Sequence, residues 1–326
     1  MYYNRTLSGS FSGLIEKGGQ LRWLFDFVKG NDELDFLVGK NNSREWISVY
    51  RGLSRIITIR PGIRNPLKIF IDGAGSYKEL CPYLYGEKNI DENFRDALED
   101  IIELVKADQR FDRYYNNRKE GYYQNKLSRR YGICGKADDQ FVIIDKEAVI
   151  GYSDQAEKDS ILEPIQERYK KLQSMLSDTD ADKFGKDLNK KPLGNELDFL
   201  ALDKQGNLLL IEFKHGTNTS GIYLSPIQIG MYFDIFKKFP KDELESAVLE
   251  MLKQRWKIGL INSRWNSPNR IENFIPVLII SGFNENSKAK ERFDEVMELL
   301  RERTGNEFLN NLKVQKYIPG KDLTGW

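Results

Sequence analysis

The chain has 326 residues, enough for two domains or one large domain with insertions, and its 50 basic and 49 acidic residues give a formal net charge of +1. This balance excludes a global electrostatic bias towards nucleic acid, so any nucleic-acid footprint must be local. The longest apolar runs are of strand length and the N-terminus lacks the apolar segment of a signal peptide, so no membrane partner is expected. Cys81 and Cys134 lie 53 residues apart without metal-ligand spacing and are too few for an iron–sulfur cluster, which favours a cytoplasmic protein with two reduced thiols.

The first half of the chain predicts a mixed α+β region. Its apolar spacing predicts strands at 46–50 and 56–60 around Arg51-Gly52, a strand at 68–71 and a helix at 91–107. Apolar runs at 141–144 and 148–150 flank three charged residues and predict a further hairpin. Residues 1–40 give no clear assignment.

A second unit is predicted to begin near residue 153, dividing the chain into domains 1–152 and 153–326. An amphipathic helix at 159–176 comes first, followed by a polar stretch at 177–194 that predicts a loop. The remaining predicted elements are strands at 196–202 and 208–214, helices at 225–238 and 241–257, a strand at 274–280, a helix at 288–303 and a strand at 313–318. The fold class is therefore α/β, or α+β over the whole chain.

One predicted strand, 208–214, ends in charged residues. Glu212 and Lys214 lie two residues apart and so share a strand face. The turn at 203–207 forms a hairpin with the preceding strand and brings Asp198 towards them. Two carboxylates and an ammonium at one point could hold a hard divalent cation beside a water. The alternative is a structural salt bridge at the end of a strand.

This order of residues resembles a known family. The features are Asp198, a hairpin, Glu212-x-Lys214, and Gln228-x-x-x-Tyr232 on one face of the next predicted helix. Together they are similar to the RecB-like branch of the PD-(D/E)xK nuclease superfamily, although Leu197 stands where the motif name has proline. The resemblance covers roughly residues 158–282 and implies a restriction-endonuclease-like αβββαβ core. The predicted strands before Asp198 are one short of that core.

The resemblance implies a role for each matching residue. Asp198, Glu212 and the Phe213 backbone carbonyl would ligate Mg²⁺ or Mn²⁺, while Lys214 would position the attacking water or stabilise transition-state charge. Gln228 and Tyr232 would support the substrate, although Tyr232 also fits an ordinary apolar helix stripe. Members of the superfamily often add an acid from the first core helix.

Several further residues are weaker candidates for the site. Glu163 is expected as the additional acid from the first core helix, with Glu167 as its neighbour, against the alternative that both are exposed surface residues. Glu196 shares a strand face with Asp198 and is either a further acid or a solvated hairpin residue. His215, the one histidine, should point away from Lys214 and is expected to be non-catalytic.

The segments beside these residues suggest contacts with substrate. Residues 216–223 predict a flexible polar loop over the site, with Ser225 as a helix N-cap. Residues 110–136 carry eight basic residues and five tyrosines against two acids. Cations with interleaved aromatic rings often hold single strands or distorted ends, and the alternative is a solvated surface with tyrosines covering the core.

We therefore predict a metal-dependent nuclease that hydrolyses DNA, or RNA, in defence, restriction or repair. Residues 1–152 would supply substrate binding, specificity or dimerisation into a homodimer. Two alternatives stay open. One is a non-catalytic nucleic-acid-binding protein of the same fold, and the other is a hydrolase or sensor that responds to a small ligand.

Overall fold

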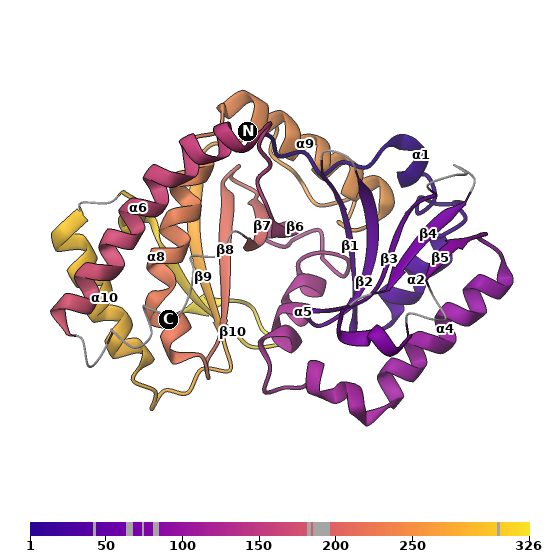
Figure 1. Cartoon of the computed structure of the whole chain (residues 1–326), viewed down its shortest axis with the longest axis horizontal. Coiled ribbons are helices and arrows are strands. Elements are labelled where there is room, and N and C mark those ends of the chain that lie inside the picture. Colours follow the sequence, from indigo (N-terminus) through magenta and orange to yellow (C-terminus); the bar gives the residue numbers. More distant parts are fainter. Residues whose placement is uncertain are drawn as a thin grey trace. The chain divides into compact units, whose positions relative to one another are not determined.

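The computed structural model describes residues 1–41, 44–62, 68–73, 75–80, 85–180, 184, 196–304 and 307–326. Two compact units make up the chain (Figure 1). The N-terminal unit consists of Asn4–Val142 and Ala247–Asn266, and the C-terminal unit of Met1–Tyr3, Ile143–Ser246 and Ser267–Trp326. The sequence predicts a single boundary at residue 152, and as a division into functional domains that boundary stays a prediction.

An antiparallel five-stranded sheet forms the centre of the N-terminal unit. Its strands follow one another in space as in sequence: β1 (Leu34–Lys40), β2 (Glu45–Arg51), β3 (Ser54–Pro61), β4 (Ile69–Gly73) and β5 (Gly86–Lys88). The helices of this unit are α1 (Gly9–Ser12), α2 (Arg22–Gly30), η1 (Gly75–Leu80), α4 (Glu92–Ala107), η2 (Gln109–Tyr114) and α5 (Glu120–Arg130). Apolar side chains of α2 and α4 form one buried cluster with those of the sheet.

The predicted hairpin and helix of this region are confirmed. β2 and β3 pair around Gly52, whose φ of +66° suits a residue without a Cβ atom. The helix predicted at 91–107 is α4, and Asp91 caps its first turn by accepting a hydrogen bond from the Phe94 N–H.

A mixed six-stranded sheet forms the centre of the C-terminal unit. Its order is β11-β10-β9-β8-β7-β6, with β6 (Phe141–Ala148), β7 (Leu197–Asp203), β8 (Leu208–His215), β9 (Phe274–Ser281), β10 (Lys313–Tyr317) and β11 (Thr324–Gly325). The helices are α6 (Gln155–Thr179), α8 (Thr219–Phe236), α10 (Ala289–Thr304) and α11 (Glu307–Asn311), while α9 (Lys241–Ile258) begins in this unit and ends in the other. Figure 1 shows α8 along β8 and β9, with α6 and α10 also packed on it.

The hairpin predicted at 141–150 is wrong, because β6 runs without a break through Asp145 and Lys146. Both charged side chains are accommodated inside the unit. The Tyr3 hydroxyl donates to Asp145 Oδ2 at 2.6 Å, and Lys146 Nζ lies 5.8 Å from the centre of the Phe199 ring. The charged residues Asp145 and Lys146 therefore lie in a continuous strand with buried contacts and do not form a turn.

The helix predicted at 225–238 begins earlier, so the flexible loop and the N-cap predicted before it are also wrong. α8 starts at Thr219, and Asn218 caps it by accepting a hydrogen bond from the Gly221 N–H. Pro226 lies inside the helix and has no N–H to donate to the carbonyl four residues earlier. The Ser225 hydroxyl donates to that Ile222 carbonyl at 2.7 Å instead, which explains how the helix continues through proline.

The other predictions concern exposure and the ends of elements. Cys134 is an exposed free thiol, while Cys81 lies outside the described residues. The loop predicted at 177–194 begins inside α6, and most of it also lies outside the described residues. Among the described helices, none combines the length and the apolarity that a membrane crossing requires.

Candidate active site

The pairing of β7 with β8 stops just before Asp198. The ladder runs from Leu202 opposite Leu208 to Phe199 opposite Ile211, whereas β8 continues beside β9 as far as His215. The last residues of β8 therefore have a ladder partner on the β9 side only. The sequence predicts the site at these ladder positions of β8 that lack a partner on the β7 side.

The turn between the two strands fixes their register. Asp203 Oδ1 accepts hydrogen bonds from the N–H groups of Gln205 at 2.9 Å and Asn207 at 2.8 Å. Gly206 completes the turn with a φ of +86°, a conformation that strains residues with a Cβ atom. Because a slip of one residue would turn every side chain to the other face, this turn decides that Asp198 faces the end of β8.

Asp198 takes the place of the missing ladder partner. Its Oδ2 accepts a hydrogen bond from the Phe213 N–H at 2.7 Å. The N–H and C=O of one residue in a strand point to the same side, so the Phe213 carbonyl faces the edge on which Asp198 lies. This is the arrangement that the predicted carbonyl ligand requires.

Glu212 and Lys214 lie together on one face of β8, as predicted. Only 1% of Glu212 and 9% of Lys214 is exposed, and Lys214 Nζ contacts Glu212 Oε1. The salt bridge expected as the alternative is therefore formed. Burying two charges costs several kcal/mol each, roughly, before their attraction offsets it, so an ion pair in this position is weak evidence for a purely stabilising role.

Tyr232 and Gln228 of α8 lie beside these carboxylates. Burial raises the pKa of the Tyr232 phenol, the negative charges of Glu212, Asp198 and Glu196 raise it further, and a hydrogen bond with the Gln228 side chain lowers it. The Tyr232 hydroxyl donates to the Glu196 backbone carbonyl. Tyr232 is thus a buried core residue, as its alternative reading expected, whose polar end reaches the acidic cluster.

The acids predicted on the first helix are surface residues, and a role for Glu163 at the site stays a prediction. Glu163 and Glu167 are both exposed on α6, and Glu167 pairs with Lys171 at 3.5 Å. Among the described residues, no hydrogen bond or ion pair joins Glu163 to Asp198 or Glu212. Glu196 is also exposed, and its backbone carbonyl contacts Tyr232.

His215 lies on the strand face opposite to Lys214. Its Nδ1 is 2.8 Å from the Thr217 hydroxyl, and burial lowers the pKa of the imidazole. A Cβ atom on Gly282 would lie 2.5 Å from His215 Nε2, so glycine at that position leaves room for the ring. These contacts account for His215 by packing.

The donor set for a metal ion is small. Within the described ranges, no group of three or more His, Cys, Asp and Glu side chains could hold a metal ion. Asp198, Glu212 and the Phe213 carbonyl offer two carboxylates and one backbone oxygen. This set suits Mg²⁺, which keeps several waters and commonly uses one or two carboxylates together with substrate phosphates, better than zinc, which takes four firm ligands in structural sites.

The basic segment 110–136 belongs to the N-terminal unit and divides into two groups. Three cations contact other segments of the unit: Lys126 pairs with Asp32 at 2.7 Å, Arg130 pairs with Asp139 at 2.6 Å, and Arg129 donates to the carbonyls of Val28, Lys29 and Leu34. The other five basic residues are exposed: Arg110, Arg113, Arg118, Lys119 and Lys136. Tyr115 and Tyr131 are buried. The segment therefore has tyrosines that cover the core, as one alternative expected, and also exposed cations, which the nucleic-acid alternative requires.

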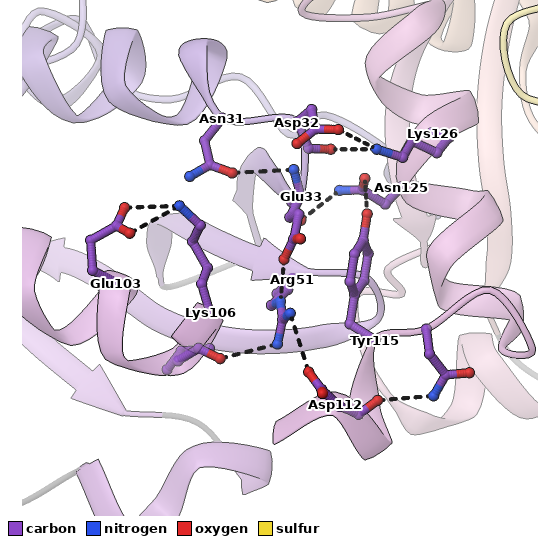
Figure 2. A network of polar contacts seen from close by, with 12 residues as sticks. Asn31, Asp32, Glu33, Arg51, Glu103, Lys106, Asp112, Tyr115, Asn125 and Lys126 are labelled. Atoms are coloured by element: carbon purple, nitrogen blue, oxygen red, sulfur yellow. Dashed lines mark hydrogen bonds and ion pairs between the residues drawn. The ribbon is translucent and has the colours of Figure 1, made fainter. Parts of the chain in front are cut away.

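A polar network around Arg51 was not predicted. Figure 2 shows Arg51 between Glu33, at 2.8 Å, and Asp112, at 3.7 Å, with its guanidinium also donating to the Val105 carbonyl at 3.0 Å. Tyr115 and Lys126 of the basic segment enter the same network through Asn125 and Asp32. Its members are far apart in sequence, so local spacing gave no signal for it.

No protein-family model, curated protein or solved structure matches this chain, so its function has to be argued from these residues and their geometry.

Proposed function

We propose that the protein is a metal-dependent nuclease that hydrolyses phosphodiester bonds in DNA. The observation that supports this most is the convergence of Asp198, Glu212 and Lys214 where the β7–β8 ladder ends. The same point carries a strand edge with an oxygen acceptor, the Phe213 carbonyl. Two acids, a cation and a backbone oxygen are the groups that phosphodiester hydrolysis with a divalent metal needs.

The arrangement of elements supports a PD-(D/E)xK-like core with two departures, the position of β6 and the extra helix α9. Helix α6, the hairpin β7–β8, helix α8 and strand β9 follow one another in the order of the αβββαβ core, with α9 inserted between α8 and β9. The strand β6 lies next to β7 in the sheet but precedes α6 in the chain, and residues 185–195, between α6 and β7, lie outside the described residues. With β6 as its outer strand, the proposed core would be a variant in which that strand comes before the first helix.

Each residue has a task in this proposal that its contacts allow. A bound Mg²⁺ or Mn²⁺ would neutralise the scissile phosphate and lower the pKa of water at the site. Asp198 and Glu212 would hold that ion, and Lys214, already oriented by Glu212, would place a positive charge where the transition state gains negative charge. Gln228 and Tyr232 would support the substrate and the acids from α8.

DNA is proposed as the substrate through the exposed cations of the N-terminal unit. Arg113, Arg118 and Lys119 are exposed near Tyr122 and Tyr123, which are both half-buried. Backbone phosphates would pair with these cations and release counterions, so binding should weaken steeply as salt rises. The non-catalytic alternative makes the same prediction for binding, and only cleavage separates the two.

The test is cleavage of circular and linear DNA, single- and double-stranded, with Mg²⁺, with Mn²⁺ or with EDTA. Wild-type protein should cut in the presence of metal, and Lys214→Ala should not. Lys170→Ala is the matched control, because Lys170 is an exposed lysine on α6 of the same unit. RNA of the same sequence tests the choice of nucleic acid.

Two results would contradict the proposal. Cleavage by Lys214→Ala at the wild-type rate would exclude the catalytic role of Lys214, and cleavage that persists in EDTA would exclude the metal. Binding without cleavage of any substrate would favour the non-catalytic alternative. Glu163→Gln, tested beside these variants, should cut like wild type unless Glu163 is the fourth ligand that the resemblance implies.

A further inference from the structure

A concave site separate from the candidate active site lies beside α8 in the C-terminal unit. It is a half-open groove of about 650 Å³ between α6, α8 and the start of α11. Its volume falls within the roughly 300–1,000 Å³ that is usual for sites that take small molecules. Neither Asp198, Glu212 nor Lys214 lines it.

The groove and the candidate active site use different faces of α8. Gln228 and Tyr232, four residues apart, form the row that lies beside the acidic cluster. Phe233 and Asp234 begin the next two rows, roughly 100° and 200° around the helix, and these rows line the groove. A ligand in the groove would therefore touch α8 without entering the candidate active site.

The apolar part of the groove is held in place by close packing. Phe233 and Phe308 have ring centroids 6.3 Å apart, and Phe308 also lies 6.5 Å from the Tyr169 ring. A Cβ atom on Gly230 would lie 2.6 Å from the Phe308 ring and 2.7 Å from the Tyr169 hydroxyl, so only glycine allows this approach. The groove therefore has a preformed wall.

The polar part of the groove is mainly cationic. Arg168, Lys237 and Lys238 line it, and Asp234 is its one acid. Asp234 Oδ2 is held by Arg168 at 3.0 Å and by the Tyr169 hydroxyl at 2.9 Å, so its charge is largely compensated within the wall. Positive charge exceeds negative charge along the rim, which favours an anion.

The lining favours one class of anion. Half of the ten lining side chains are polar and half are apolar, and the two kinds are interspersed along both α6 and α8. A fatty acid would need a continuous apolar channel behind its carboxylate, and inorganic phosphate would leave the apolar wall unused. A nucleotide has phosphate for the lysines, hydroxyls for the polar groups and a flat ring for the apolar side chains.

We propose that this groove binds a nucleotide, with Lys237 and Lys238 recognising its phosphates and the wall of α6 and α11 contacting its base. The proposal does not depend on nuclease activity. The competing explanation is that both lysines only complement the negative end of the α8 dipole. In that case reversing their charge would change the stability of the protein, and neither the wild type nor the variant would bind a nucleotide.

The experiment is calorimetric titration of the full chain with adenosine diphosphate in EDTA, which keeps metal away from the candidate active site. Wild-type protein should bind at one site with a dissociation constant below about 1 mM, and inorganic phosphate and decanoate should bind at least about tenfold more weakly. Lys237→Glu with Lys238→Glu should weaken binding at least roughly tenfold. Lys170→Glu with Lys171→Glu makes the same change of net charge on α6 outside the groove, and should leave binding within about twofold.

Each other outcome overturns the proposal. These are no saturable binding by wild type, equal binding of decanoate or inorganic phosphate, or unchanged binding by the Lys237/Lys238 variant. If that variant fails to fold, Lys238→Gln replaces it and should weaken binding roughly threefold or more. Lys214→Ala should bind adenosine diphosphate like wild type, which separates this site from the candidate active site.

Discussion

Arg129 in the N-terminal unit and Lys214 in the C-terminal unit are both buried cations, 7% and 9% exposed. Arg129 donates to three backbone carbonyls between residues 28 and 34, and so joins α5 to the end of α2 and the start of β1. Lys214 contacts the carboxylate of Glu212 at a strand end that has lost its partner on one side. Burial of charge is common to both, and only the surroundings distinguish a structural cation from a candidate catalytic one.

The comparison also applies to the polar groups around each cation. Arg51 satisfies a carbonyl and two carboxylates from three segments of the N-terminal unit, at Val105, Glu33 and Asp112 (Figure 2). In the C-terminal unit, Asp198 replaces a ladder hydrogen bond with a charged side chain. A structural role would not require a charge there, because a neutral acceptor could make the same hydrogen bond.

The largest effect on stability should come from Arg129→Met. This change removes the donor to the carbonyls of Val28, Lys29 and Leu34, of which Val28 still accepts from the Asn31 N–H. A carbonyl left unsatisfied costs about 1–3 kcal/mol, so loss of this donor for the other two should lower the free energy of unfolding by about 2–6 kcal/mol. Urea unfolding followed by circular dichroism measures it. Lys136→Met, at an exposed position of the same segment, should change the value by less than about 0.5 kcal/mol. A loss below about 1 kcal/mol for Arg129→Met would show that Arg129 is not the structural cation with which Lys214 is compared.

Asp198→Asn should separate function from structure most sharply. Asparagine keeps an oxygen that can accept from the Phe213 N–H but removes the charge, so the free energy of unfolding should change by less than about 1 kcal/mol. The cleavage rate should fall roughly hundredfold to thousandfold, about 2.7–4 kcal/mol, because the lost charge is one that holds the metal. Single-turnover cleavage at saturating Mg²⁺ measures it.

Asp203→Asn is the control for that variant. It makes the same chemical change at the other end of β7, where Asp203 holds the turn. Cleavage should stay near the wild-type rate although stability falls. Equal loss of activity in both variants would mean that activity follows the integrity of the hairpin, and the candidate site would lose its support.

Gly230→Ala should oppose the usual helix propensity. Alanine normally stabilises a helix relative to glycine by about 1 kcal/mol, but here the added Cβ atom meets Phe308 and Tyr169 at less than 3 Å. Overpacking of this kind costs about 1–3 kcal/mol, so after the gain in helix propensity we expect a net loss of about 0–2 kcal/mol in the free energy of unfolding, measured by thermal unfolding. Gly30→Ala, at the end of α2 with nothing within 4 Å of its Cβ position, should not destabilise. Equal changes in stability for Gly230→Ala and Gly30→Ala would show that the Phe308 ring moves aside at little cost.

Sequence patterns predicted those elements in which one local signal dominates. The apolar stripe predicts α4, and the apolar run before Glu212 predicts β8. The β6 strand was misread because Asp145 and Lys146 interrupt the apolar run, and their partners Tyr3 and Phe199 are far away in sequence. Long-range contacts decide such cases, and spacing along the chain does not contain them.

At the candidate site, too, local patterns predict some features, and contacts between distant segments decide the others. Alternation along β8 predicts that Glu212 and Lys214 share a face, and the turn at Asp203 predicts that Asp198 returns to them. The early start of α8 could not be read, since proline at position 226 usually marks a helix start and here the Ser225 hydroxyl compensates for it. The groove beside Lys237 could not be read either, because three separate helices form it.

The last expected effect is confined to high pH and concerns a buried tyrosine of the N-terminal unit. Burial raises the pKa of Tyr77 to about 12, and the nearby Arg51 charge lowers it only in part. A phenol with a folded-state pKa above its unfolded value of about 10 keeps its stabilising contribution below pH 10 and loses it as pH rises from about 10 to 12. Stability should therefore fall over this window by about 1.4 kcal/mol per pH unit for this one group.

Tyr77→Phe removes that titration and should flatten the fall in stability between pH 10 and 11.5, as measured by urea unfolding at each pH. Tyr85→Phe is the control, because Tyr85 is 60% exposed and should leave the slope unchanged. Tyr115, whose pKa burial also raises, remains in both variants, so some decline should persist in each. A slope for Tyr77→Phe equal to that of wild type would mean that water reaches the ring when the phenol ionises. The packing of Tyr77 against Phe111 and Tyr114, with centroids at 5.1 Å and 5.6 Å, would then be looser than its burial implies.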